Sequence, residues 1–332
     1  MSIQHRFLPT LRALGLGLLA AGQVWAHEGP EHEIEELTDL IAKGETADLL
    51  LQRAIEYRVI GKNSEAATDL ERASQLDSSS LLLQRELGRA YFAIGKTNEA
   101  VDLLSHALKA KTEQPTELAS LRALRAEFLG ARNENKKALE DCEAAIRLQL
   151  SNVEWYLLRS DFHRRLKLTK ERIAGLEQGI RETGAGILET ERVEALLEDA
   201  QYATALPLIE QELKASRIQG SWLIRRARAR LGLGEKDAAK ADLETALREI
   251  NRRVNSTAAN PTLLTERALA HELLGAREEA RGYYEQARDA GADDWVKDKI
   301  KTLKAEEEAR AKELEKEKEK EKSRQAAGSD SK

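Results

Sequence analysis

Residues 61–77 read GKNSEAATDLERASQLD, and a related stretch, GKTNEAVDLLSHALKAK, follows at residues 95–111. Both copies begin with a glycine, and both place an alanine in the next turn, followed by leucine and alanine at helical spacing. A period of about 34 residues is typical of stacked helical repeats, in which each unit packs only on its neighbours. The sequence therefore predicts an elongated array of helical hairpins.

The composition agrees with a helical chain. Of its 332 residues, 33% are charged, 4% are aromatic and only five are proline. A chain rich in alanine, leucine, glutamate, arginine and lysine favours helices over sheets. The formal net charge is −5 with both signs interleaved, so no basic footprint points to nucleic acid as a partner. The single cysteine, Cys142, excludes an intramolecular disulfide framework.

Extending the alignment gives seven units, which span residues 47–80, 81–114, 119–152, 153–186, 186–219, 220–253 and 261–294. The packed face of the second helix opens at Ala66, Ala100, Ala138, Arg172, Ala205, Ala239 and Ala280. One turn later the chain has Leu70, Leu104, Cys142, Leu176, Ile209, Leu243 and Tyr284. The first helix contributes Ala54, Gly88, Ala126, Ser160, Val193, Ala227 and Ala268. Small side chains at fixed points let two antiparallel helices approach closely, while larger neighbours fill the remaining space.

The second unit has the fullest pattern, with Leu87, Gly88, Tyr91, Gly95, Ala100, Leu104 and Ala107. In these residues the chain resembles the tetratricopeptide repeat family. The resemblance implies an all-α fold, a right-handed superhelical α-solenoid of about seven helical hairpins. Units four and five depart from the pattern at Arg172, Val193 and Glu212, so the sequence leaves their register open.

The first 26 residues have the features of a cleaved signal peptide. Arg6 and Arg12 accompany the apolar run LGLGLLAA, and VWA at residues 24–26 offers a cleavage site. The run is too short to span a bilayer comfortably, so we expect export without stable membrane insertion after cleavage. This predicts a periplasmic protein or, alternatively, a secreted one. An uncleaved anchor is the other interpretation.

Residues 27–46 form an acidic segment with a short predicted helix. Ile34, Leu37, Leu40 and Ile41 recur at helical spacing until Gly44. This pattern predicts an amphipathic helix that packs on the first repeat.

Two histidines in the same segment suggest a possible metal site. After cleavage, His27 would offer an α-amine and an imidazole to one Cu(II) ion, and His32 a third nitrogen. The competing interpretation is two solvated histidines in an acidic segment. We therefore predict no cofactor, with His27 and His32 as weak metal candidates.

The end of the chain predicts a cap and an extension at residues 295–322. Trp295, Val296, Ile300 and Leu303 form an apolar stripe, after which the sequence is almost wholly charged. Like charges recur at i,i+4 beyond Leu314, so we expect the helix to fade near 315–322 and residues 323–332 to be disordered.

No motif predicts catalysis. His163 and His271 occupy matching points of the first helix in units four and seven, where packing or a groove edge explains them. Cys142 takes the place of a core leucine, and a nucleophile would need a nearby base that the sequence does not provide. GLGEK at residues 232–236 lacks the Walker spacing and fits a turn between helices. We predict that the protein is not an enzyme.

The concave surface, lined by the first helices, is the remaining candidate site. Its predicted partner-binding residues are Arg58, Arg85, Arg89, Glu127, Asp161, Arg164, Arg165, Glu194 and Arg228. Arginines at such points can grip carboxylates of a partner bidentately. The alternative is a solvated face with alternating charge and no ligand.

Three functional hypotheses follow. The first is an exported, non-catalytic scaffold or adaptor that binds a protein or peptide segment in the groove. The second is a copper-handling accessory protein that uses His27 and His32. The third is an assembly subunit that contacts partners through its charged C-terminal helix.

Overall fold

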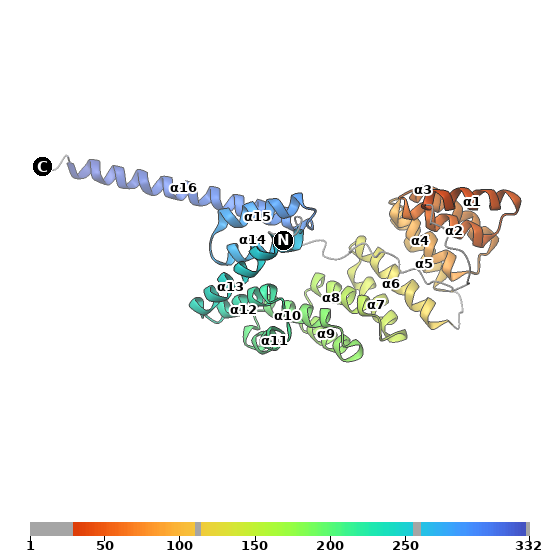
Figure 1. The fold of residues 1–332 in the computed structure, drawn as a ribbon, viewed down its shortest axis with the longest axis horizontal. Helices are drawn as coiled ribbons and strands as arrows, with labels where there is room; N and C mark the ends of the chain where they lie inside the picture. The colour runs from red at the N-terminus through yellow and green to blue at the C-terminus, as the bar shows by residue number, and fades with distance from the viewer. Residues whose placement is uncertain (1–28, 110–113, 255–259, 330–332) are drawn as a thin grey trace. The chain divides into compact units, whose positions relative to one another are not determined.

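The structure, a computed structural model, describes residues 29–109, 114–254 and 260–329, and within them the chain forms sixteen α-helices and no strand (Figure 1). The predicted all-α fold of helical hairpins is confirmed. Two compact units follow one another along the chain, and their boundary lies between Ala195 and Leu196.

The first compact unit contains α1 (Pro30–Lys43), α2 (Ala47–Val59), α3 (Asn63–Leu76), α4 (Leu81–Ala93), α5 (Thr97–Ala107), α6 (Pro115–Ala131), α7 (Asn135–Leu148), α8 (Val153–Arg165) and α9 (Thr169–Thr183). The boundary falls inside α10 (Gly186–Glu198). The second compact unit contains α11 (Tyr202–Ala215), α12 (Gly220–Gly232), α13 (Lys236–Val254), α14 (Pro261–Leu273), α15 (Arg277–Asp289) and α16 (Trp295–Ser329). Consecutive helices pack against each other in six hairpins, α2 with α3, α4 with α5, α6 with α7, α8 with α9, α12 with α13 and α14 with α15. Between the fourth and fifth of these pairs, α10 and α11 follow one another along the chain.

The turn within each of these hairpins contains one residue with positive φ, and so does the turn between α10 and α11. The residue is Gly61, Gly95, Asn133, Lys167, Ala200, Gly234 or Gly275. A left-handed conformation costs most residues roughly 1–2 kcal/mol but suits glycine, which has no Cβ. Because the turn residue recurs at the same place in every unit, it fixes the register of units four and five.

The small residues of the second helices lie in the core. Each alanine of the set is fully buried, at Ala66, Ala100, Ala138, Ala205, Ala239 and Ala280. Close approach is also visible at Gly179 of α9, where a Cβ would lie 2.8 Å from Leu188 Cδ1 and 2.8 Å from the ring of Tyr156. The predicted order of small and large side chains therefore describes the real helix contacts.

An ion pair between an arginine and a buried aspartate joins the two helices in three hairpins, and it was not predicted from the sequence. In the first hairpin, Arg53 donates to both carboxylate oxygens of Asp69, at 2.7 and 2.8 Å. Arg125 and Asp141 repeat this contact at 2.6 and 2.8 Å, and Arg226 and Asp242 repeat it at 2.9 and 2.6 Å. We call this contact the arginine fork. In each fork, the arginine lies just before the small residue of the first helix.

The N-terminal helix α1 packs on α2 as predicted. Leu37 is buried, and Ile41 packs against the core of the first hairpin. Thr38 Oγ1 also accepts a hydrogen bond from Arg53 Nη1 at 2.9 Å, which ties α1 to the first fork. Leu40 differs from the prediction, because it is 46% exposed. The apolar stripe of α1 is therefore narrower than its sequence pattern.

The C-terminal helix α16 caps α15. Val296, Ile300 and Leu303 are buried in a cluster with Tyr284, and Trp295 packs against that cluster. The helix continues to Ser329, so the predicted fading near 315–322 places its end too early. Glutamate, lysine, arginine, glutamine and alanine are strong helix formers, and opposite charges at i,i+3 offset the like charges at i,i+4.

The predicted signal peptide at 1–26 and His27 lie outside the described residues. Among the helices that are described, none has the length and the apolar character that crossing a membrane requires.

Candidate functional site

The candidate site lies on the first helices of four hairpins, α2, α4, α6 and α8, all in the first compact unit. We call the surface formed by these helices the first-helix face. Side chains from one first helix reach the next across it, as the ion pair between Arg58 of α2 and Glu86 of α4 shows. The first-helix face is therefore a continuous surface within this unit.

Three predicted arginines converge on one carboxylate that the sequence analysis missed. Glu86 is only 6% exposed, and it accepts hydrogen bonds from Arg58, from Arg85 Nε at 3.2 Å and from Arg89 Nη1 at 2.9 Å. Arg85 Nη1 also donates to Glu117 on α6 at 3.2 Å. Charge-assisted hydrogen bonds hold the guanidinium groups in place. The arginines thus form a fixed cluster that Glu86 and Glu117 partly neutralise.

Glu127 on α6 is next to this cluster. Its side chain opens to solvent, but protein surrounds it on several sides. Desolvation raises the pKa of Glu127 to about 7, while the positive charge of Arg89 lowers it and the negative charge of Glu154 raises it further. Near neutral pH this carboxyl group is therefore partly protonated.

The acidic and basic residues of α8 form a second group. Asp161 accepts a hydrogen bond from Arg164, and its Oδ2 lies 2.5 Å from Arg165 Nη2. Arg165 Nη1 also donates to the carbonyl oxygen of Gly130, at 3.1 Å, and so connects α8 to the end of α6. The structure therefore brings these three predicted residues together.

The last two predicted residues lie further along the chain. Glu194 is half-buried on α10, within the first compact unit, whereas Arg228 is half-buried on α12 of the second. The structure therefore places eight of the nine predicted residues in one compact unit. Six of them form two ion-paired groups, Glu127 lies beside the first group, and Glu194 lies on α10.

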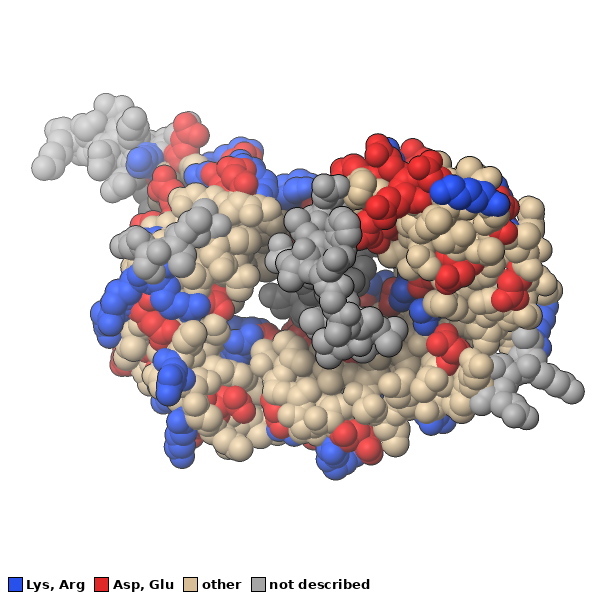
Figure 2. All heavy atoms as spheres, turned by 45° about the vertical axis from the view of Figure 1, so that its right-hand side comes forward, with Lys and Arg blue, Asp and Glu red and all other residues tan. Residues whose placement is uncertain are grey.

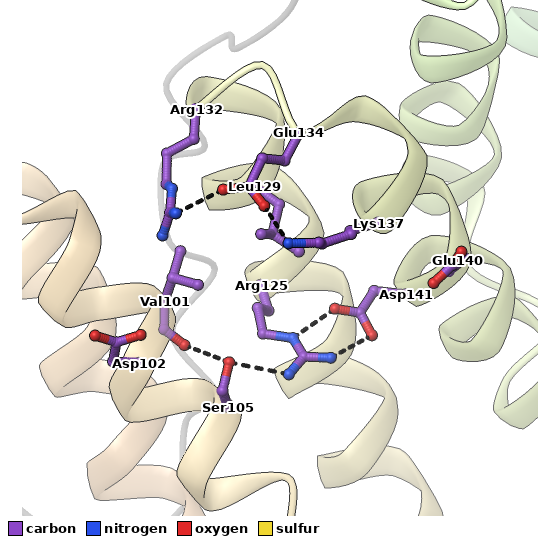
Figure 3. Close-up of a pocket in the computed structure, with 10 residues that line it drawn as sticks. All are labelled: Val101, Asp102, Ser105, Arg125, Leu129, Arg132, Glu134, Lys137, Glu140 and Asp141. Carbon is purple, nitrogen blue, oxygen red and sulfur yellow. Dashed lines mark hydrogen bonds and ion pairs between the residues drawn. The ribbon is translucent and has the colours of Figure 1, made fainter.

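A polar pocket of about 320 Å³ lies elsewhere in the same unit, between α5, α6 and α7 (Figure 3). Arg125 and Asp141 of the second fork line it, and Ser105 Oγ accepts a hydrogen bond from Arg125 Nη1 at 3.1 Å. At the other end, Glu134 pairs with Arg132 at 2.6 Å and with Lys137 at 2.7 Å. The sequence analysis named none of these residues as a site. Most of the charges in the pocket already neutralise one another, so we do not place the site there.

Charge on the outer surface is mixed. Figure 2 shows acidic and basic side chains scattered over a mostly uncharged face, with acidic side chains gathered at its upper right. Among the coloured residues, neither sign covers that face.

The residues considered for chemistry serve the core. Cys142 is fully buried, its thiol donates to the carbonyl oxygen of Trp155 at 3.2 Å, and burial raises its pKa to about 12. A thiol with this pKa is a poor nucleophile at neutral pH. Residues 232–236 run from the last residue of α12 to the first residue of α13, and the turn between them has Gly234 at φ +85°. The prediction of a turn is confirmed there.

The two matching histidines differ in their surroundings. His163 on α8 is 5% exposed, and burial lowers its pKa to about 4. His271 on α14 is half-buried and packs on the ring of Tyr283, with 5.1 Å between ring centroids. His163 is therefore a core residue rather than a groove edge.

The described residues contain no group of three or more histidine, cysteine or acidic side chains arranged to hold a metal ion. His32 lies on α1 and pairs with Glu36 at 3.3 Å. The copper site with His27 stays a prediction.

Comparisons with known proteins agree with this architecture. Residues 61–124 match the tetratricopeptide repeat family. A tetratricopeptide repeat protein from Parabacteroides merdae is 16% identical, with a TM-score of 0.58, and the match covers 78% of this chain and 99% of that one. The C-terminal part of a TPR repeat-containing protein from Cytophaga hutchinsonii is 15% identical, with a TM-score of 0.52, covering 76% and 97%. At this identity the similarity shows the fold alone. No curated protein sequence matches the chain at a significant level.

Proposed function

We propose that the chain is a non-catalytic adaptor of the tetratricopeptide repeat type, which binds a protein or peptide segment on its first-helix face. The fold implies a scaffold for protein–protein interaction. We choose the first-helix face as the binding surface because Arg58, Arg85 and Arg89 converge there on Glu86.

This cluster is suited to recognition because its shape is fixed while part of its surface stays open. The side chain of Arg89 is 42% exposed and that of Arg58 is 32% exposed. Guanidinium groups already held by hydrogen bonds lose little conformational entropy when a partner binds. A carboxylate of the partner would accept hydrogen bonds from N–H groups that Glu86 and Glu117 leave free. We therefore expect the partner segment to bring an acidic residue to α4.

The test is affinity capture from the envelope fraction of the native host, with the chain from His27 as bait. We expect a specific protein to be retained by the wild-type chain and lost with Arg85→Ala/Arg89→Ala. The matched control is Arg248→Ala/Arg252→Ala, which removes the same charge from α13 in the second compact unit. Equal recovery by all three baits would contradict binding on the first-helix face.

Export is part of this proposal. The signal-peptide pattern of residues 1–26 supports a periplasmic adaptor that is not stably inserted in the membrane. N-terminal sequencing of the protein from its host tests this proposal, and a first residue other than His27 would contradict cleavage at the expected site.

A second candidate places the contact on α16. Beyond Leu303 nearly every side chain of α16 up to residue 318 is exposed, including Leu314 at 49%. Such a helix is available to a partner. Truncation after Thr302 tests this candidate, because a partner that is still captured by the shortened chain does not need the extension.

A further inference from the structure

The fourth hairpin, α8 and α9, buries an arginine without a carboxylate. Arg159 is 8% exposed and occupies the place that Arg53, Arg125 and Arg226 take in the three forks. Gly175 replaces the aspartate, and in the described chain Arg159 donates to the Gly175 carbonyl oxygen at 2.6 Å and to Gln178 Oε1 at 3.0 Å. Both acceptors are neutral. Desolvation accordingly lowers the pKa of Arg159.

A second buried arginine lies in the same hairpin. Arg172 is 5% exposed and stands where the other second helices have alanine. Its Nε donates to Ser160 Oγ at 3.0 Å, and its Nη2 lies 3.4 Å from Glu191 Oε2 on α10. This hairpin therefore holds two guanidinium groups, whereas each fork pairs one guanidinium with an aspartate and has alanine at the place of Arg172.

His163 is a third buried titratable residue of this hairpin. It is 5% exposed, and its Nδ1 is buried without a hydrogen-bond partner among the described residues. The charged groups that act on it are Arg159 of its own helix and Glu171 and Arg172 of α9. A proton on His163 would place a third positive charge in the same core, with Glu171 and Glu191 as the acidic neighbours.

We propose that the fourth hairpin is an acid-sensitive element of the first-helix face, in which protonation of His163 separates α9 from α8. In the open hairpin, water solvates the imidazolium and both guanidinium groups. Asp161, Arg164 and Arg165 lie on α8, so opening removes their ordered arrangement from the face. Loss of this arrangement would release a bound partner in acid, and this consequence rests on the proposed function. The opening itself does not.

The direction and size of the effect follow from proton linkage. His163 takes up a proton with a pKa of about 4 in the closed hairpin and about 6.5 in the open one. The open form therefore binds more protons between these values, so the equilibrium constant for opening increases as the pH falls from 6.5 towards 4. The expected increase between pH 7 and pH 4 is on the order of 100-fold.

The experiment is amide hydrogen exchange of the full chain, resolved by mass spectrometry at pH 7, 5.5 and 4 and corrected for intrinsic exchange. We expect peptides of α8 and α9 to lose protection as the pH falls, ahead of peptides of α2 and α3 in the same molecule. His163→Phe keeps a ring in the core without a titrating group and is expected to abolish this difference. His271→Phe, at the matching point of α14, is the control and is expected to leave α8 and α9 unchanged.

Equal pH profiles for wild type and His163→Phe would overturn the proposal. So would a wild-type fourth hairpin that is no more acid-sensitive than the first. If His163→Phe does not fold at pH 7, His163→Gln and an NMR titration of His163 in the wild type take its place, and a folded-state pKa near 6.5 would then overturn it. Acid opening combined with equal capture by Arg85→Ala/Arg89→Ala would reject the proposed binding face and leave the acid response standing.

Discussion

Arg53 and Asp69 are joined by two hydrogen bonds in the first hairpin, from Nε to Oδ2 at 2.7 Å and from Nη2 to Oδ1 at 2.8 Å. Nη1 of the same guanidinium donates to Thr38 at 2.9 Å, so one side chain connects α1, α2 and α3. The second hairpin has Leu87 and Leu103 at the two corresponding positions. The first two hairpins therefore fill one contact in two ways, with a bidentate ion pair and with an apolar pair.

The difference between these two pairs predicts the result of breaking a fork. Asp69→Leu leaves the guanidinium of Arg53 buried without its acid, and we expect the free energy of unfolding to fall by about 3–5 kcal/mol. Arg53→Leu/Asp69→Leu copies the second hairpin and should cost much less. Urea denaturation followed by circular dichroism measures both. A double variant that is as unstable as the single one would show that the ion pair is not exchangeable.

The fourth hairpin offers the reverse experiment. Gly175→Asp supplies the carboxylate that Arg159 lacks, and it replaces a glycine within a helix. The new Cβ would lie 3.0 Å from Arg159 Nη2, at the end of a long side chain that can move. We expect a gain of about 1 kcal/mol or more, observed as a higher Tm.

Gly179→Ala is the matched control on the same helix. Its Cβ would lie 2.8 Å from Leu188 and Tyr156, which are packed in the core, so this variant should lower Tm. A decrease in both variants would indicate that α9 tolerates no side chain on this face.

The turn residues of units four and five predict stabilising substitutions. Ala200 has φ +56° and Lys167 has φ +59°, a conformation that glycine adopts without strain. Ala200→Gly and Lys167→Gly should each raise the free energy of unfolding by roughly 0.5–1 kcal/mol, because relief of strain exceeds the added flexibility of the unfolded chain. Gly95→Ala, with φ +81° in the wild type, is the reciprocal control and should destabilise. Thermal melts of the three variants test the set.

From the raised pKa of Glu127 on the first-helix face, we predict that the stability of the protein depends on pH. Because its pKa is raised to about 7, mainly by desolvation, its contribution to stability is present below the unfolded value of about 4.5 and is lost as the pH rises through 7. Glu127→Gln should therefore gain in Tm relative to wild type as the pH increases from 5 to 8. Glu140→Gln, which removes an exposed carboxylate from α7, controls for the change in net charge. A Tm difference for Glu127→Gln that stays constant with pH would contradict a raised pKa.

The hairpins were predictable because they depend on local pattern. The residues Gly61, Ala66 and Leu70 recur at fixed spacing, and each is either a turn residue or a contact between adjacent helices. Units four and five were harder because Lys167 and Ala200 take the glycine position of the turn. Because lysine and alanine rarely adopt positive φ, the sequence does not indicate the left-handed conformation that packing imposes on these two residues.

The polar contacts were less predictable because they join separate helices. A signal for the forks was present, since an arginine precedes the small residue of the first helix in six units, at Arg53, Arg125, Arg159, Arg192, Arg226 and Arg267. The acidic partner of each arginine cannot be identified from the sequence unless it is known which helices pack together. Glu86 is similar. In the sequence, Glu86 is one acidic residue among many charged ones. Its burial beneath three arginines depends on the contact between α2 and α4.

The helices at the two ends of the array, α1 and α16, are held by different kinds of contact. Salt concentration therefore affects them differently. Helix α1 is held by Leu37 and Ile41. The part of α16 that follows its apolar stripe is held by ion pairs, which are Arg277–Glu306 at 3.1 Å, Arg281–Glu307 at 3.0 Å and Lys304–Glu285 at 3.1 Å. Partly exposed pairs of this kind weaken as dissolved salt increases. A cell in fresh water and a cell in brine would thus present the same chain with different lengths of α16 docked on α15, while α1 stays in place in both.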